Sequence, residues 1–149
     1  MHITHATAAD IPALSGLLNV LFSQEAEFTP DAEAQQRGLG MIIGNPDIGC
    51  ILLARNAEGE VQGMVNLLWT VSTALGARVA LLEDMVVAPL ARGLGVGSRL
   101  LNAAIAEANR QGCQRLTLLT DADNVDAQRF YRRQGFVPSP MAPWRLQLG

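Results

Sequence analysis

Two adjacent acids, Glu83 and Asp84, stand inside the otherwise apolar stretch "LLEDMVV". A carboxylate among apolar residues is unusual, because burial disfavours its charged form, and it indicates a functional site. Such a carboxylate can take a proton from a reacting group as a general base. Shortly after the acids come Arg92 and three glycines at every second position, a pattern that frees the backbone between two elements.

The glycines lie between an expected strand, residues 77–88, and an expected helix that begins at Gly95 and ends at Gly112. The start of a helix leaves backbone N–H groups without partners, and the helix dipole favours an anion there. Glycine removes the Cβ atoms that would keep a phosphate away, and Arg92 adds a planar donor suited to phosphate. The loop therefore predicts a phosphate-bearing ligand, although a flexible turn with a surface arginine explains the same residues equally well.

A dinucleotide is one ligand class for such a loop. The fingerprint G-x-G-x-x-G usually follows the first strand of the fold. Here Gly93, Gly95 and Gly97 form G-x-G-x-G, Ser98 occupies the position of the third glycine, and the loop lies in mid-chain. A nicotinamide-dependent oxidoreductase is therefore the weaker alternative.

The surrounding elements predict a mixed α/β fold in one domain, residues 1–149. Apolar residues at helical spacing predict a helix over 11–22 with Asp10 as its N-cap. The predicted order is β-α-α-β-β-β-α-β-α-β-β, with a β-α-β unit in its centre. The other predicted helices span 31–43 and 125–134, and the predicted strands span 2–6, 50–56, 61–71, 77–88 and 115–121, followed by two short strands within 136–148.

Composition excludes several functions. The net charge of −3 argues against a general nucleic-acid binder, and no apolar run is long enough to span a bilayer. All 11 basic residues are arginine, so neither a Walker A lysine nor a Schiff-base lysine exists. Cys50 and Cys113 lie far apart and outside any CxxC, so we expect buried thiols and no metal site. These features are typical of a cytoplasmic protein.

The loop "RGLGVG", residues 92–97, and the segment "NVDAQRFYRRQGF", residues 124–136, both resemble motifs of the GNAT superfamily of acyl-CoA-dependent N-acetyltransferases. "RGLGVG", residues 92–97, is similar to the R/Q-x-x-G-x-G/A loop that binds the pyrophosphate of acyl-CoA, and the preceding "LEDMVVAP" resembles the family's fourth strand. "NVDAQRFYRRQGF", residues 124–136, matches the family segment N-x-x-A-x-x-F-Y-x-x-x-G-F. The resemblance covers essentially the whole chain and implies a GNAT-like fold with a central, splayed pair of parallel strands.

The resemblance also implies how acetyl-CoA is bound as a co-substrate. The strand ending at Val87 would splay from the strand at 116–120, and the pantetheine arm would lie in that gap. Asn124 would bond the arm, and Ala127 and Phe130 would pack against it. Backbone groups would hold the arm at Met85, Val86 and Val87, and the pyrophosphate at Arg92, Gly93, Leu94, Gly95, Val96, Gly97 and Ser98.

The catalytic roles follow from the same resemblance. Tyr131 would protonate the departing thiolate as general acid, and Glu83 would accept the proton of the amine, directly or through water, without a covalent enzyme intermediate. Strand alternation places Glu83 and Asp84 on opposite faces, and the choice of base between them, or a water chain, stays open. Tyr131 as a core aromatic and Asn124 as a helix N-cap are the structural alternatives.

The predicted function is acetyl transfer from acetyl-CoA to a primary amine of a small molecule or peptide. Asp84 and Glu27, with their neighbouring acids, suggest binding of a cationic amine, although a solvated acidic loop explains Glu27 as well. A non-catalytic acyl-CoA-binding module is the main alternative. A homodimer is common in the family and stays open here.

Overall fold

The computed structural model describes residues 1–24 and 29–149 of the chain. Within them the chain divides into two units, Met1–Leu119 and Thr120–Gly149, and each unit is described by itself.

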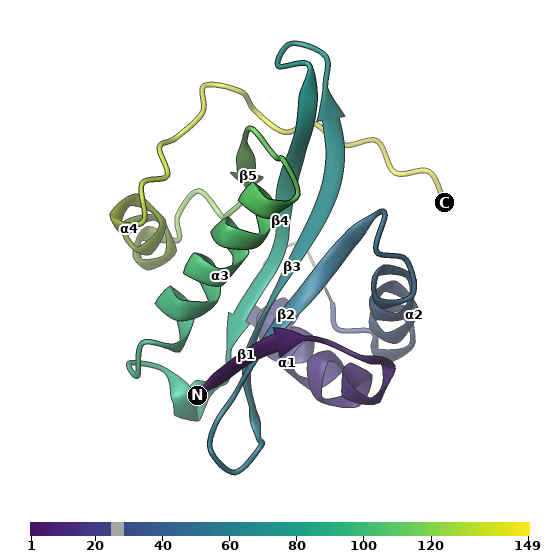
Figure 1. Cartoon of the computed structure of the whole chain (residues 1–149), viewed down its shortest axis with the longest axis vertical. Coiled ribbons are helices and arrows are strands. Elements are labelled where there is room, and N and C mark those ends of the chain that lie inside the picture. Colours follow the sequence, from purple (N-terminus) through teal and green to yellow (C-terminus); the bar gives the residue numbers. More distant parts are fainter. Residues whose placement is uncertain (25–28) are drawn as a thin grey trace. The chain divides into compact units, whose positions relative to one another are not determined.

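The first unit contains one five-stranded sheet with its strands in chain order (Figure 1). Neighbouring strands are antiparallel except for the last pair, β4 and β5, which is parallel. This arrangement confirms the predicted mixed sheet. The strands are β1 (His2–His5), β2 (Gly49–Arg55), β3 (Val61–Ser72), β4 (Ala77–Val87) and β5 (Leu116–Leu118).

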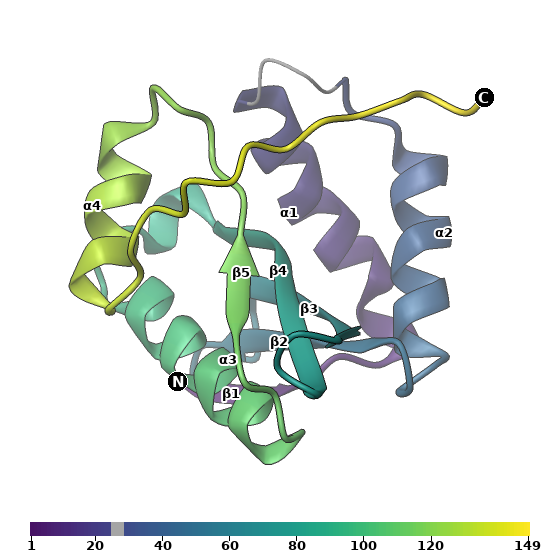
Figure 2. The same cartoon turned by 90° about the horizontal axis from the view of Figure 1, so that it is seen from above.

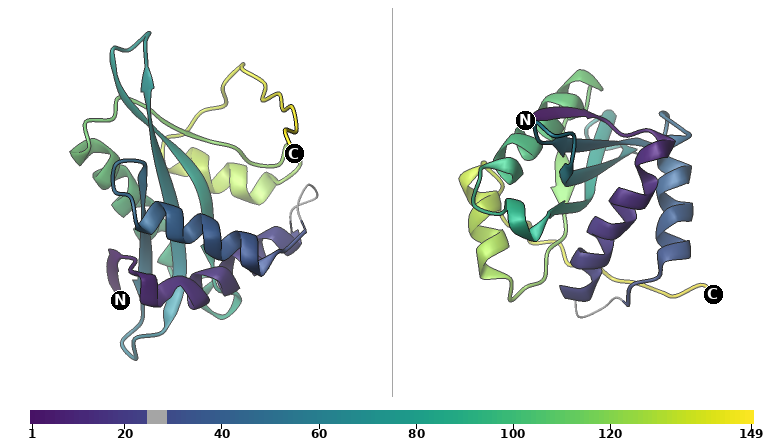
Figure 3. Two further views of the ribbon diagram at one scale, coloured as in Figure 1. Left: turned by 90° about the vertical axis from the view of Figure 1, so that its right-hand side faces the viewer. Right: turned by 90° about the horizontal axis from the view of Figure 1, so that it is seen from below.

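Helices cover both faces of this sheet. α1 (Ile11–Gln24) and α2 (Ala32–Ile43) lie side by side on one face, and α3 (Val96–Arg110) lies on the other (Figures 2 and 3). The alternation of apolar residues along the strands supplies a core for each face. The core under α1 and α2 consists of Leu14, Leu17, Leu18, Leu39, Ile51, Leu53, Met64 and Val86.

Gly63 sets how closely α3 packs on the sheet. A Cβ atom at Gly63 would lie 2.8 Å from Leu100 Cδ1, 3.0 Å from the Val86 carbonyl oxygen and 3.3 Å from Val96 Cγ1. Val96 is the first residue of α3. The absence of a side chain at Gly63 therefore allows the start of this helix, which follows the glycine loop, to pack closely against β3.

The start of α1 differs from the sequence prediction. A short 3-10 helix, Ala8–Asp10, precedes α1, and Thr7 is its N-cap. The Asp10 carboxylate accepts a hydrogen bond from the Thr7 backbone N–H at 2.8 Å and forms an ion pair with Arg55. Asp10 is therefore the N3 residue of a capping box with Thr7, and the prediction that it caps α1 is wrong.

β5 accompanies β4 over only part of its length. Ala80, Leu81 and Leu82 pair with Leu116, Thr117 and Leu118, and β5 then ends. In the described chain the outer edge of β4 has no strand partner from residue 83 to residue 87. The two parallel strands thus stop pairing after Leu118, and β5 is shorter than the predicted strand. The prediction of a central pair is wrong for the described sheet, because β5 is its last strand and no strand forms beyond it.

The second unit contains one helix, α4 (Val125–Arg133). The two short strands predicted within residues 136–148 are not formed, so the described chain has five strands. The prolines at positions 138, 140 and 143 explain this, because proline lacks the N–H that a strand ladder needs. Among the described helices of both units, none has the length and apolar character that a membrane crossing requires.

Gly63→Val is expected to lower the free energy of unfolding by about 1–3 kcal/mol, because the new side chain must displace Leu100 and Val96. Gly40→Val is the matched control, since a Cβ at this helical glycine would meet nothing within 4 Å. We expect the control to change the free energy of unfolding by less than about 0.5 kcal/mol. Urea unfolding measures both, and equal effects would show that α3 does not depend on Gly63.

Candidate active site

A β-bulge in β4 brings the two adjacent acids to one side of the sheet. Asp84 pairs with Asn66 of β3. The next pair joins Leu82 to Leu67, so β4 has one extra residue here, Glu83. Such a bulge re-aims the neighbouring side chains. Glu83 and Asp84 consequently line the same pocket, and the expectation that they lie on opposite faces is wrong.

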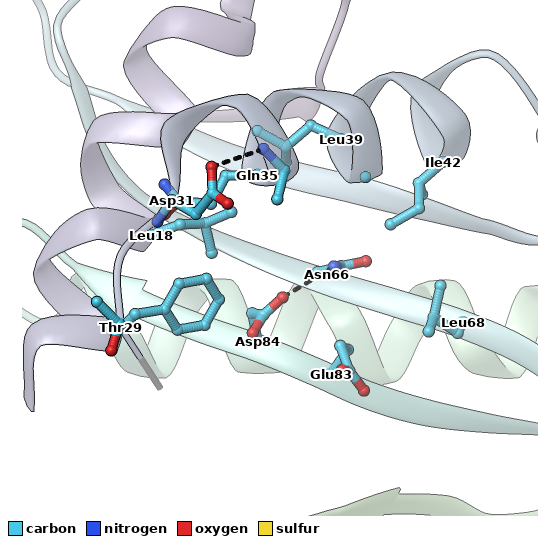
Figure 4. Close-up of a pocket in the computed structure, with 13 residues that line it drawn as sticks. Leu18, Thr29, Asp31, Gln35, Leu39, Ile42, Asn66, Leu68, Glu83 and Asp84 are labelled. Carbon is cyan, nitrogen blue, oxygen red and sulfur yellow. Dashed lines mark hydrogen bonds between the residues drawn. The ribbon is translucent and has the colours of Figure 1, made fainter. Parts of the chain in front are cut away.

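The pocket has a volume of about 420 Å³ and lies between α1, α2 and the strands β3 and β4 (Figure 4). Among the described residues, six apolar side chains and six polar ones line it, together with Gly38. This combination is typical of a small-molecule site. In the described part of the chain the lining consists of Leu18, Phe22, Thr29, Asp31, Ala34, Gln35, Gly38, Leu39, Ile42, Asn66, Leu68, Glu83 and Asp84.

Asn66 and Asp84 form the polar floor of this pocket. The side-chain N–H of Asn66 donates a hydrogen bond to Asp84 Oδ2 at 3.1 Å. Burial raises the pKa of Asp84 to about 6; the Asn66 hydrogen bond opposes the rise, and the nearby Glu83 carboxylate adds to it. Asp84 therefore changes charge just below neutral pH, a range suited to proton transfer. Glu83 is exposed.

Hydrogen bonds fix the α2 wall of the pocket against α1. The Asp31 carboxylate caps α2 by accepting a hydrogen bond from the Ala34 N–H at 3.2 Å. Gln35 Oε1 accepts the Asp31 N–H at 2.8 Å, and its Nε2 donates to the Ser15 carbonyl oxygen of α1 at 3.0 Å. The buried Gln35 amide thus joins the two helices. The Asp31 carboxylate serves as the N-cap of α2.

The glycine loop has the backbone geometry that the sequence suggested. Gly93 and Gly95 both have φ of +80°, a region that disfavours other residues. Gly95 is the N-cap of α3, and among the described residues no side chain caps this helix start. Arg92 is exposed, and a Cβ at either glycine would meet nothing within 4 Å. An open helix start beside an arginine fits a phosphate group.

The predicted contacts of β4 with the pantetheine arm fall where its outer edge has no strand partner in the described chain. Val86 is 6% exposed and packs in the core beneath α1 and α2, while Met85 and Val87 are half-buried. Backbone groups on that edge are therefore what this segment offers to a ligand.

α4 carries the predicted residues of the second unit. The Asn124 side chain accepts the Ala127 N–H at 3.1 Å, so Asn124 is a helix N-cap. The Tyr131 ring makes edge contacts with the rings of Phe130 and Phe136, at centroid distances of 5.2 and 5.7 Å. Burial raises the pKa of Tyr131 to about 12, so its hydroxyl stays protonated at neutral pH.

Sequence reasoning found the two β4 acids of the pocket and, among the acids near Glu27, Asp31, but it missed the remaining lining residues. Asn66 is the main omission, and its signal was available: one amide stands in the apolar run "GMVNLLW", as the acids do in theirs. Glu27, a predicted substrate-binding residue, lies outside the described residues.

Asp84→Asn is expected to stabilise the protein at high pH. The folded-state pKa of about 6 lies above the usual 3.8, so the folded protein binds a proton at Asp84 more tightly than the unfolded chain does. The protonated carboxyl therefore adds to the free energy of unfolding at low pH, and this contribution is lost as the pH rises through 6. The substitution should raise the free energy of unfolding by up to roughly 3 kcal/mol near about pH 8 and far less near about pH 4.

Urea unfolding at both pH values measures this difference. Asp47→Asn, at an exposed turn position, is the control. A gain of equal size at both pH values would contradict the raised pKa of Asp84.

Comparison with known proteins finds relatives that match most of the chain. Residues 13–136 match the acetyltransferase (GNAT) family. The chain is 31% identical over 137 residues to the aminoalkylphosphonate N-acetyltransferase of Salmonella typhimurium, covering 92% of this chain and 85% of the relative. It is 43% identical over 89 residues to the mycothiol acetyltransferase of Paenarthrobacter aurescens, covering 58% of this chain and 27% of that protein.

A solved structure agrees with the sequence comparisons. The crystal structure of a probable acetyltransferase superposes with a TM-score of 0.85 at 26% identity, covering 100% of this chain and 99% of that one. GNAT acetyltransferases use acetyl-CoA as co-substrate, which leaves the nicotinamide alternative without support. Because the family match spans most of the sequence, this chain belongs to the GNAT family of N-acetyltransferases.

Proposed function

We propose that the chain transfers the acetyl group of acetyl-CoA to a primary amine of a small molecule or peptide bound in the pocket. One observation carries the proposal: Glu83 and Asp84 line this pocket where the outer edge of β4 loses its strand partner. An amine held by these carboxylates lies beside the stretch from Met85 to Val87 that we expect to hold the pantetheine arm.

The amine must be neutral to attack, because an ammonium has no free electron pair. We assign Glu83 as the base, since it is exposed at the pocket and can be reached by an ammonium or by water. Asp84, which is half-buried and bonded to Asn66, is assigned to hold the amine. The ammonium first gives one proton to Glu83. The neutral nitrogen then bonds to the thioester carbonyl carbon, the C–S bond breaks, and the second proton that the nitrogen loses passes to solvent.

The thiolate that leaves needs a hydrogen-bond donor, and we assign Tyr131 to this role. Its raised pKa keeps the phenol protonated but also makes it a weaker acid. We therefore expect a hydrogen bond from the hydroxyl to stabilise the thiolate before the proton is transferred. Solvent then restores the phenol proton, and the products are an N-acetyl amide and the free thiol of CoA.

The remaining predicted residues are proposed to bind the co-substrate. Backbone N–H groups from Arg92 to Ser98 would hold the pyrophosphate. Asn124 would bond the pantetheine arm, with Ala127 and Phe130 packed against it. The organisation of residues 1–149 as one domain and a cytoplasmic location stay predictions from the sequence.

Acetyl-CoA-dependent release of CoA in the presence of primary amines tests the proposed function. Polyamines, amino acids, aminoglycosides and peptide N-termini form the first panel. Tyr131→Phe is expected to keep acetyl-CoA affinity, because the ring and its contacts remain, while kcat falls roughly 10²-fold. Turnover equal to that of the parent protein would remove Tyr131 from the mechanism.

The pH dependence of turnover distinguishes the two carboxylates. Glu83→Gln is expected to abolish the fall of kcat/KM at low pH and to recover part of its activity at high pH, where the amine is already neutral. Asp84→Asn should raise KM and keep that fall. A fall near pH 6 that disappears in Asp84→Asn would instead reassign the base to Asp84, whose pKa is about 6.

A further inference from the structure

The charges around the pocket have one sign. Among the lining residues that the structure describes, the charged side chains are Asp31, Glu83 and Asp84, and none is a cation. Because Asp31 caps α2, the carboxylates available to a ligand are those on β4. These described residues therefore attract a positive group and offer no cation to a negative one.

Asn66 supplies an independent sign of a ligand. The residue is 3% exposed and lines the pocket. Its side-chain N–H is used by Asp84, but its Oδ1 is buried and has no hydrogen-bond partner among the described residues. Figure 4 shows this oxygen pointing away from Asp84, on the side of Leu68. A buried acceptor without a hydrogen-bond partner lowers the stability of the protein. We therefore interpret this oxygen as a position where a ligand N–H donates the missing hydrogen bond.

On the side of Asn66 that faces away from Asp84, the labelled side chains are mainly apolar, with Glu83 below Asn66 (Figure 4). Leu39 and Ile42 of α2 lie above this apolar end of the pocket and Leu68 of β3 lies below it (Figure 4). A hydrocarbon chain gains free energy by leaving water for such a surface, whereas a second charge there would lose its hydration without finding a partner.

Resting on the proposed acetyltransferase function, we propose that the pocket selects a primary monoamine with an apolar tail. The ammonium donates hydrogen bonds to Asn66 Oδ1 and to the Asp84 carboxylate before it loses its proton to Glu83. The tail lies between Leu68 and the α2 residues Leu39 and Ile42. Asn66 is thus a substrate-binding residue that identifies the amine by its N–H groups.

This acceptor class differs from the one in the name of the Salmonella relative. An aminoalkylphosphonate carries an anionic group next to its amine. In this chain that anion would face carboxylates and apolar side chains. A diamine would place its second ammonium at the apolar end. Both should therefore bind more weakly than a monoamine of matched length.

The test measures binding and turnover separately. Titration calorimetry on the CoA-saturated protein compares hexylamine with its terminal diamine, its terminal amino acid and an aminoalkylphosphonate. We expect hexylamine to bind at least tenfold more tightly than each of the others. Equal or tighter binding of the amino acid or the phosphonate overturns the inference. Absence of CoA release with every amine would overturn the proposed function, while the order of binding still decides the acceptor class.

Two variants place the selectivity at the named residues. Ile42→Arg should weaken hexylamine binding and strengthen binding of the amino acid, because it puts a cation at the apolar end. Met41→Arg, the control, makes the same change at a neighbouring position that is 67% exposed and outside the lining. Asn66→Leu should weaken hexylamine at least tenfold while CoA affinity persists. Unchanged hexylamine affinity in both Ile42→Arg and Asn66→Leu overturns the assignment, and retained CoA affinity shows that each variant is folded.

Discussion

The extra residue of β4 is the constraint on which the site depends. β3 holds β4 along nearly its whole length, so the register on either side of the bulge is set by many backbone pairs. In a regular strand, one of the two acids would point to the face that α3 covers, where Leu67 and Leu82 are buried. The bulge instead turns both Glu83 and Asp84 toward α1 and α2, where the sheet leaves a pocket.

The pocket persists because its walls are tied together independently of a ligand. Gln35 joins α2 to α1, and the core beneath both helices packs on the strands. The polar floor of the pocket lowers the stability of the fold. Asp84 loses hydration, and Asn66 Oδ1 has no hydrogen-bond partner in the described chain. Polar groups buried at such a cost are typical of sites where a ligand later supplies the missing interactions.

The sheet separates two tasks in the first unit. On one face, Gly63 allows α3 to pack closely and thereby sets the position of the glycine loop. On the other face, α1 and α2 leave the acceptor pocket of the proposed function. β4 links the two regions, because it carries Glu83 and Asp84 and ends at Val87, shortly before the glycine loop. In the proposed function, the acyl donor and the amine would meet at this strand.

The features that the sequence by itself determined are local. Residue spacing predicted the helices and the strands through β5, and the glycine spacing predicted a loop with a free backbone before α3. The motif at residues 124–136 indicated the family that the comparisons show.

Tertiary structure decided whatever depends on partners distant in the chain. The bulge arises from the pairing of β4 with β3. Asn66 uses its side-chain N–H to bind Asp84, and its oxygen is left without a partner in the described chain. The role of Asp10 depends on its contacts with Thr7 and Arg55. The C-terminal residues 144–148 have alternating apolar side chains but form no strand. The preceding prolines lack the N–H that a ladder needs, and a strand also needs a neighbour to bond its backbone, which a local pattern cannot supply.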